Sequence, residues 1–173
     1  PFCDGVALEG IHIICRALPL AVENGQDLEA RGKMLVAAAM GGVAFQKDLG
    51  AVHSMAHPLS ALCGMHHGLA NAICLPHVMA WNAARKPGLY RRIGLACGLN
   101  VLNLKDEEAD AKTINYLKKF IANLDCKGGL RKHGVKESQV EALATQAFRD
   151  ACHLTNPVAV NHEDLKALYL AAL

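Results

Sequence analysis

The chain contains 173 residues, of which 52% are hydrophobic and 20% are charged, and its net charge is +2. This balance predicts a soluble globular domain with one sizeable core and argues against disorder. So small a net charge favours neither a nucleic acid nor a membrane surface as a partner. We also expect no membrane span, because no apolar run approaches roughly 20 residues. The start at Pro1, without a signal-peptide pattern, favours a chain cut from a longer protein.

Apolar residues recur at helical spacing along the chain, and no segment has a convincing strand pattern. Pro76 predicts a kink or break in one of the helices. In another, Leu28, Leu35, Ala39 and Val43 share a predicted apolar face. The expected helices cover residues 5–22, 27–45, 54–63, 68–84, 89–99, 111–124, 140–151 and a last segment capped by Asn161. The sequence therefore predicts an all-α fold of about eight helices over residues 1–173.

Three further patterns bear on the function. Neither G-x-G-x-x-G nor G-x-x-x-x-G-K-[ST] occurs, so no phosphate-binding loop is recognisable. The seven cysteines include no C-x-x-C pair, which favours free thiols in a reducing cytoplasm over a disulfide framework. Five of the nine histidines lie between residues 53 and 77, a density typical of a metal or proton-transfer site.

The spacing of three histidines points to one shared volume. His53 and His57 lie four residues apart, on one face of a helix, and His67 follows Gly64 near the start of the next helix. Imidazole is a suitable ligand for Zn²⁺ and Fe²⁺. The H-E-x-x-H signature is absent, because Ser54 and Ala56 stand between the two histidines. From spacing alone, a structural role in the core is as well supported for the pair His53 and His57 as a role in a metal site.

The segment AFQKDLGAVHSMAHPLSALCGMHHGLANAICLPHVMAWN resembles the signature of the iron-containing (group III) alcohol dehydrogenases. The segments CDGVALEGIHII, ARGKMLVAAAMGGVAF, GGLRKHGV and ACHLTNPVAVNHEDLKALY are similar to other parts of that family, so the resemblance spans essentially the whole chain. It implies a single all-helical metal-binding domain over residues 1–173, of the dehydroquinate synthase-like architecture. The family's N-terminal dinucleotide-binding domain is absent from this chain.

The resemblance implies a role for each matching residue. His53 and His67 match two metal ligands, for Fe²⁺ or alternatively Zn²⁺, and His57 matches a catalytic histidine that transfers protons. Phe45 and Cys152 match positions that line the substrate cleft. The family's D-x-x-x-H ligand pair has no counterpart, since Leu8 follows Asp4 by four residues, so the chain alone is expected to be inactive. No cofactor-binding residue is assigned, because NAD or NADP binds mainly to the missing domain.

The implied reaction is hydride transfer between a nicotinamide and a short-chain alcohol or hydroxy acid, giving its aldehyde or ketone. We expect a cytoplasmic homo-oligomer, for instance a dimer. Two alternatives stay open: a non-catalytic helical assembly module derived from the same family, and a zinc-dependent relative of the glycerol dehydrogenase or dehydroquinate synthase type. Lys47 could attract a substrate carboxylate, although a solvated surface lysine is favoured. Five other histidines are expected to be structural: His66, His77, His133, His153 and His162.

Overall fold

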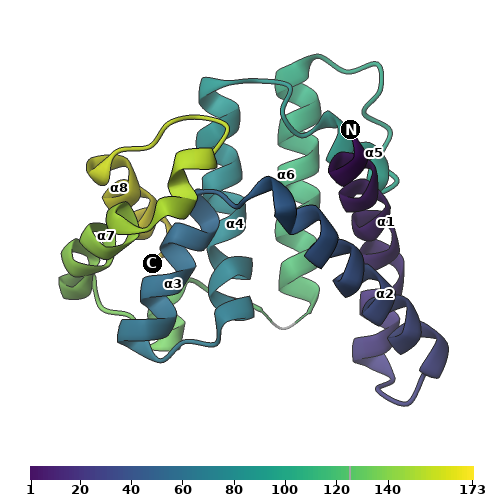
Figure 1. Cartoon of the computed structure of the whole chain (residues 1–173), viewed down its shortest axis with the longest axis horizontal. Coiled ribbons are helices and arrows are strands. Elements are labelled where there is room, and N and C mark those ends of the chain that lie inside the picture. Colours follow the sequence, from purple (N-terminus) through teal and green to yellow (C-terminus); the bar gives the residue numbers. More distant parts are fainter. Residues whose placement is uncertain (125) are drawn as a thin grey trace. The chain divides into compact units, whose positions relative to one another are not determined.

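The computed structural model describes residues 1–124 and 126–173, and within them it contains eight α-helices, four short 3₁₀ helices and no strand. The α-helices are α1 (Phe2–Glu23), α2 (Leu28–Ala44), α3 (Ala51–Cys63), α4 (His67–Arg85), α5 (Arg91–Ala96), α6 (Asp106–Asn123), α7 (Val140–Arg149) and α8 (His162–Ala172) (Figure 1). The predicted all-α class is confirmed.

The chain divides into two compact units. Unit 1 comprises Pro1–Lys47 and Gly88–Thr113, and unit 2 comprises Asp48–Pro87 and Ile114–Leu173. Helices α1, α2 and α5 belong to unit 1, α3, α4, α7 and α8 belong to unit 2, and α6 contributes to both. The expectation of one domain over residues 1–173 stays a prediction.

Unit 1 is built on a pair of helices, α1 and α2, that lie side by side (Figure 1). The Asp27 carboxylate caps α2 by accepting a hydrogen bond from the amide of Ala30 at 2.9 Å, as its sequence position predicts. The predicted apolar face of α2 is wrong, however. Ala30 and Ala37 are its buried residues, whereas the side chains of Leu28 and Leu35 are 81% and 74% exposed.

Close packing explains this reversal. A Cβ atom added to Gly10 of α1 would lie 3.5 Å from the Cβ of Met40 on α2, in ordinary van der Waals contact. Helices that approach this closely leave room for alanine but not for leucine between them. The larger apolar side chains of α2 therefore point away from α1.

Helix α1 is long and apolar enough to cross a membrane, judged by length and composition alone. The expectation that no segment is long and apolar enough for a membrane span is therefore wrong for α1. Core helices and signal sequences pass the same test, so it assigns no membrane role to α1.

Unit 2 holds the larger core. Met55 and Leu59 of α3, Leu143 of α7 and Tyr169 of α8 are fully buried in one cluster. The Tyr169 hydroxyl donates a hydrogen bond to the carbonyl of Met55 at 2.7 Å, which satisfies the polar end of a buried ring. The chain thus joins α3 to α8 by packing and by a buried hydrogen bond.

The ends of the unit 2 helices follow the sequence closely. Gly64, at φ 64°, ends α3 in the left-handed conformation that glycine adopts easily, and α4 begins at His67. Asn161 and Asp164 cap α8 reciprocally, each side chain accepting from the other's amide, as predicted. Of the predicted kink or break at Pro76, the break is wrong, because α4 continues through this residue, and the kink stays a prediction. Pro76 is buried in this unit, and packing there outweighs the lost hydrogen bond.

Candidate active site

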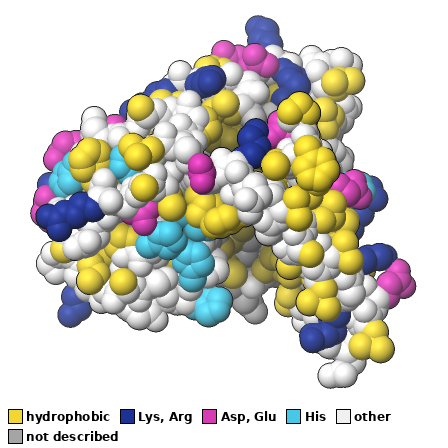
Figure 2. All heavy atoms as spheres, viewed as in Figure 1, with side chains coloured by type: hydrophobic (Ala, Val, Ile, Leu, Met, Phe, Trp, Pro, Cys, Tyr) yellow, Lys and Arg dark blue, Asp and Glu magenta, His cyan; other side chains and the backbone are white. Residues whose placement is uncertain are grey.

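Helix α3 and the first residue of α4 bring three imidazole rings together. His53 and His57 lie one turn apart on α3, and the short connection after Gly64 returns His67 to them. The ring centroids are 5.9 Å apart for His53 and His57, 5.4 Å for His53 and His67, and 5.3 Å for His57 and His67. Figure 2 shows a group of histidine side chains near the middle of the visible face, with other histidines apart from it. We call these three residues the histidine triad.

The donor chemistry of the histidine triad fits a divalent metal ion. Two imidazoles that bind one tetrahedral ion at about 2.1 Å hold their ring centroids about 5 Å apart, close to the separation of His53 and His67. The amide nitrogen of Asn71 lies 3.0 Å from Nε2 of His67. Its oxygen is buried and accepts no hydrogen bond from the described residues. Imidazole nitrogens with an unsatisfied oxygen beside them make a polar site suited to Fe²⁺ or Zn²⁺.

Asp150 fixes the orientation of His57. Its Oδ2 lies 2.6 Å from Nδ1 of His57, while its Oδ1 accepts hydrogen bonds from the Ser54 hydroxyl at 3.2 Å and from the Cys152 amide at 2.8 Å. A histidine whose Nδ1 donates to a carboxylate presents Nε2 as the nitrogen that can exchange a proton or bind a metal. Asp150 therefore determines which nitrogen of His57 is available.

The sequence interpretation missed Asp150. Asp150 caps the 3₁₀ helix Ala151–Thr155, and its carboxylate accepts from the backbone two residues on, a pattern common for aspartate at such turns. The signal was its position two residues before Cys152, which had already been singled out. The missing information was the packing of α7 against α3, since 93 residues separate Asp150 from His57.

Three pKa shifts describe the electrostatics. Burial alone would raise the pKa of Asp150, but hydrogen bonds from His57 and Cys152 outweigh it and hold the pKa well below its usual value. Burial, assisted by the nearby His67 and His57, lowers the pKa of His53. Burial and the adjacent Asp150 carboxylate raise the pKa of Cys152 to about 11. At neutral pH the site therefore holds an ionised Asp150, a neutral His53 and a protonated Cys152.

A second donor group overlaps the first. Ligand atoms of His57, Asp150 and Cys152 all lie within 4.8 Å of one another. The 2.6 Å contact between His57 and Asp150 is a direct hydrogen bond, shorter than the roughly 3.3 Å between two ligands of one tetrahedral ion. The histidine triad therefore fits a metal better than this group does.

An open cleft of about 380 Å³ lies next to His57. Besides His57 it is lined by apolar residues of α3 and by polar residues at the end of α7 and directly after it: Pro58, Ala61, Leu62, Gln146, Arg149 and Asp150. A small organic molecule fits a space of this size. His57 thus borders a space with room for a reactant.

The other predicted site residues lie in both units. Cys152 lies beside Asp150 in unit 2, within reach of His57. Phe45 belongs to unit 1, where it begins the 3₁₀ helix Phe45–Lys47 and is 54% exposed. Lining of the substrate cleft by Phe45 and Cys152 stays a prediction. Lys47 forms an ion pair with Asp4 at 2.7 Å, which fits its interpretation as a surface lysine.

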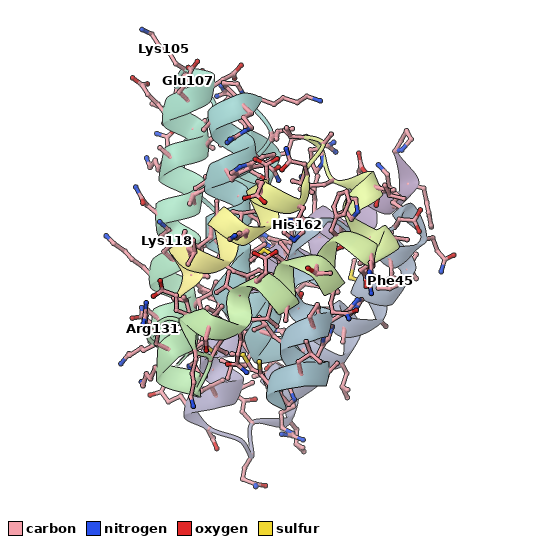
Figure 3. All side chains as sticks on the ribbon, turned by 90° about the vertical axis from the view of Figure 1, so that its left-hand side faces the viewer. Phe45, Lys105, Glu107, Lys118, Arg131 and His162 are labelled. Carbon is pink, nitrogen blue, oxygen red and sulfur yellow. The ribbon has the colours of Figure 1, made fainter. Side chains whose placement is uncertain are left out.

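Two of the histidines interpreted as structural have structural contacts. His162, at the start of α8 (Figure 3), interacts with the hydroxyl of Thr145 at 3.3 Å and with Glu141 at 3.4 Å, both on α7. His153 is buried, lies 3.0 Å from the carbonyl of Phe148 and stacks on the Phe148 ring. These contacts hold the C-terminal helices together.

Residues 1–173 match the model of the Fe-containing alcohol dehydrogenase family, C-terminal part. The chain belongs to this family. It is 36% identical over 174 residues to the NAD-dependent methanol dehydrogenase of Bacillus methanolicus, and 34% identical over 173 residues to the 4-hydroxybutyrate dehydrogenase of Cupriavidus necator. The match covers 100% of this chain and 46% of the first relative, and 97% and 44% for the second.

Solved structures show the same iron-containing alcohol dehydrogenase fold. A crystal structure of a 1,3-propanediol oxidoreductase superposes on the whole chain with a TM-score of 0.96 at 34% identity, and the match covers 46% of that protein. An alcohol dehydrogenase from Oenococcus oeni gives a TM-score of 0.94 at 28% identity over 98% of this chain. The chain therefore spans less than half the length of these relatives and corresponds to the family's C-terminal part.

Proposed function

We propose that the chain is the metal-binding, catalytic half of a nicotinamide-dependent alcohol dehydrogenase. The observation that carries this proposal is the histidine triad with Asp150 behind His57. An enzyme of this kind needs ligands for a divalent ion, which unprotonated imidazole rings can supply. It also needs a titratable group beside the ion that can accept the proton of the alcohol. The chain offers both within one unit.

The metal proposed here is Fe²⁺, with Zn²⁺ as the alternative. His53 and His67 would hold it, because their rings are at the right separation and His53 is neutral at physiological pH. When bound, the metal supplies Lewis-acid polarisation of the alcohol oxygen, and the nicotinamide accepts the hydride.

The remaining steps belong to this chain's own residues. Asp150, ionised and fixed by Ser54 and the Cys152 amide, keeps the proton of His57 on Nδ1. Nε2 of His57 can then take the proton released from the substrate hydroxyl and pass it to water in the neighbouring cleft. Cys152, held as a thiol, and Phe45 would contact the substrate carbon chain.

The relatives define the proposed substrate class. They include enzymes named for methanol, 1,3-propanediol and 4-hydroxybutyrate, which are all small alcohols. We therefore propose a short-chain alcohol or hydroxy acid as the substrate, with NAD or NADP as the hydride acceptor. A cytoplasmic homo-oligomer is part of the same proposal.

The test uses the full-length protein that contains this chain, purified without air. His53→Ala and His67→Ala should each lower the bound iron or zinc to well below one equivalent and abolish alcohol-dependent reduction of NAD or NADP. His66→Ala is the matched control, because His66 neighbours His67 but caps α4 without a side-chain hydrogen bond. This variant should keep both metal and activity.

His57→Ala separates the two roles in the triad. We expect this variant to retain metal and to lose most of its turnover, because the proton acceptor is removed while His53 and His67 remain. Retention of one equivalent of metal in both the His53 and His67 variants would refute the metal site. A metal-loaded protein inactive with every short alcohol would instead favour the non-catalytic assembly module.

A further inference from the structure

Unit 1 contains a pair of cysteines that the proposed reaction does not use. Cys15 lies on α1 and Cys97 follows directly after α5, with 82 residues between them in sequence. Their Sγ atoms are 3.3 Å apart, and both side chains are partly exposed to solvent. The remaining cysteines have no thiol partner in the hydrogen bonds of the described residues, so this pair stands apart from them.

Two other contacts hold α5 along the same face of α1. Arg92 forms an ion pair with Asp4 at 3.1 Å, and Nδ1 of His12 lies 3.1 Å from the carbonyl of Ala96. Positions 4, 12 and 15 of α1 thus face positions 92, 96 and 97 in order. The two contacts therefore hold the segments that carry the two thiols next to each other.

We propose that Cys15 and Cys97 form a reversible intramolecular disulfide when unit 1 meets a low-molecular-weight disulfide such as oxidised glutathione. A disulfide needs the two Sγ atoms about 2.05 Å apart, so they must close by a little over 1 Å. Gly98, which follows Cys97 at φ 80°, gives the backbone at this end a glycine turn that can accommodate the movement.

The exchange has two steps. One sulfur of the pair, as its thiolate, attacks one sulfur of glutathione disulfide, forming a mixed disulfide and releasing one glutathione thiolate, which takes up the proton. The other sulfur, which lies 3.3 Å away and loses its proton, then attacks the first sulfur and releases the second glutathione. Two thiols and one disulfide become one protein disulfide and two glutathione thiols.

The thin core of unit 1 gives this bond a physical consequence. The buried residues of α1 and α2 are Gly10, Ala17, Ala30 and Ala37, which contribute little apolar surface. A covalent link between α1 and the segment after α5 closes a loop of about 80 residues in the unfolded chain and so restricts it. We expect the disulfide to raise the melting temperature of the helical transition by roughly 5 °C or more.

The experiment treats the full-length protein with oxidised glutathione, blocks the remaining thiols, and maps the cysteines by mass spectrometry before and after dithiothreitol. The expected product is a peptide pair linked through Cys15 and Cys97, two hydrogens lighter than its reduced form and absent after reduction. Cys3→Ser, a cysteine of the same helix, is the matched control and should give the same link.

The two single variants test the exchange step. In Cys97→Ser and in Cys15→Ser no second thiol can displace the glutathione, so each variant should keep one glutathione on its remaining cysteine of the pair. Circular dichroism checks that each variant is folded, and the oxidised form of the unmutated protein provides the melting shift independently of either variant. Recovery of Cys15 and Cys97 as free thiols, or of either one linked to a different cysteine, would overturn the proposal. Dehydrogenase activity plays no part in this test.

Discussion

Units 1 and 2 are both helical, yet their helices are stabilised in different ways. In unit 2, methionine, leucine and tyrosine side chains from α3, α7 and α8 fill one buried cluster. In unit 1, α1 and α2 meet through glycine and alanine, while large apolar side chains of α2 face outward. The histidine triad lies on the helices of unit 2. Metal ligands must be held within fractions of an ångström of one geometry, which requires a tightly packed core beneath them. Unit 2 provides such a core.

The largest expected effect tests this difference in packing directly. Leu143→Ala, at a fully buried position of α7, should lower the free energy of unfolding by about 3 kcal/mol, because it leaves a cavity. Leu28→Ala, at a position of α2 that is 81% exposed, should change it by less than about 0.5 kcal/mol. Urea unfolding of residues 1–173 measures both values.

Trp81 makes this measurement specific to one unit. It is the single tryptophan of the chain, lies on α4 and packs against the core of unit 2. Its fluorescence therefore follows unit 2, whereas circular dichroism follows the helices of both units. Equal losses of unfolding free energy in the two variants would show that the outward face of α2 is covered by another surface. The proposed difference in packing between the two units would then be wrong.

A smaller effect is expected when the support of His57 is removed. Asp150→Asn should lower kcat/KM of the full-length enzyme by about 10- to 100-fold, because the amide no longer fixes the proton on Nδ1 of His57. Metal content should stay near one equivalent, since His53 and His67 are untouched.

Ser54→Ala is the graded control for this prediction. It removes one of the hydrogen bonds that hold Asp150 but leaves the Asp150 contact to His57, so its loss should be several-fold at most. A loss of metal in Asp150→Asn would instead indicate that Asp150 itself belongs to the ligand set, through the second donor group with Cys152.

The sequence predicted more of the fold than of its packing. Caps such as Asp27, Gly64 and Asn161 act on neighbouring residues, so the helix ends they determine could be read locally. The outward face of α2 could not be predicted in this way. Spacing identifies an apolar stripe on a helix, but it does not say whether a neighbouring helix, here α1, approaches closely enough to exclude leucine. The break allowed for at Pro76 does not occur for a similar reason, since its surroundings and not its own chemistry decide whether α4 continues.

The same distinction applies to the site. His53, His57 and His67 lie within fourteen residues of one another, so helical spacing and one glycine turn were enough to group them. Asp150 directly follows α7, and only the packing of α7 on α3 places it against His57. Cys15 and Cys97 are likewise brought together by two helices far apart in sequence, which a reading of cysteine spacing does not detect.

The smallest expected effect is a difference in how the two units respond to acid. Burial, with His67 and His57, lowers the folded-state pKa of His53 below its unfolded value of 6.5. The unfolded chain therefore binds more protons below pH 6.5, and the stability of unit 2 should fall as the pH drops through that value. The pKa of Asp150 is also lowered, so its contribution is present above pH 3.8 and is lost as the pH falls further.

In unit 1 the carboxylate with a lowered pKa is that of Asp4, which is partly exposed to solvent. Hydrogen bonds and charge from Lys47 and Arg92 lower the pKa of Asp4, but all three side chains are in contact with solvent, so salt should screen their effect. Urea midpoints of the metal-free chain between pH 7 and 5, followed by Trp81 fluorescence, should decline equally at low and high salt. His53→Asn should flatten that decline. If high salt abolished the decline, or if His53→Asn left the decline intact, the loss of stability would come from surface charges. The acid sensitivity of unit 2 would then not arise from His53.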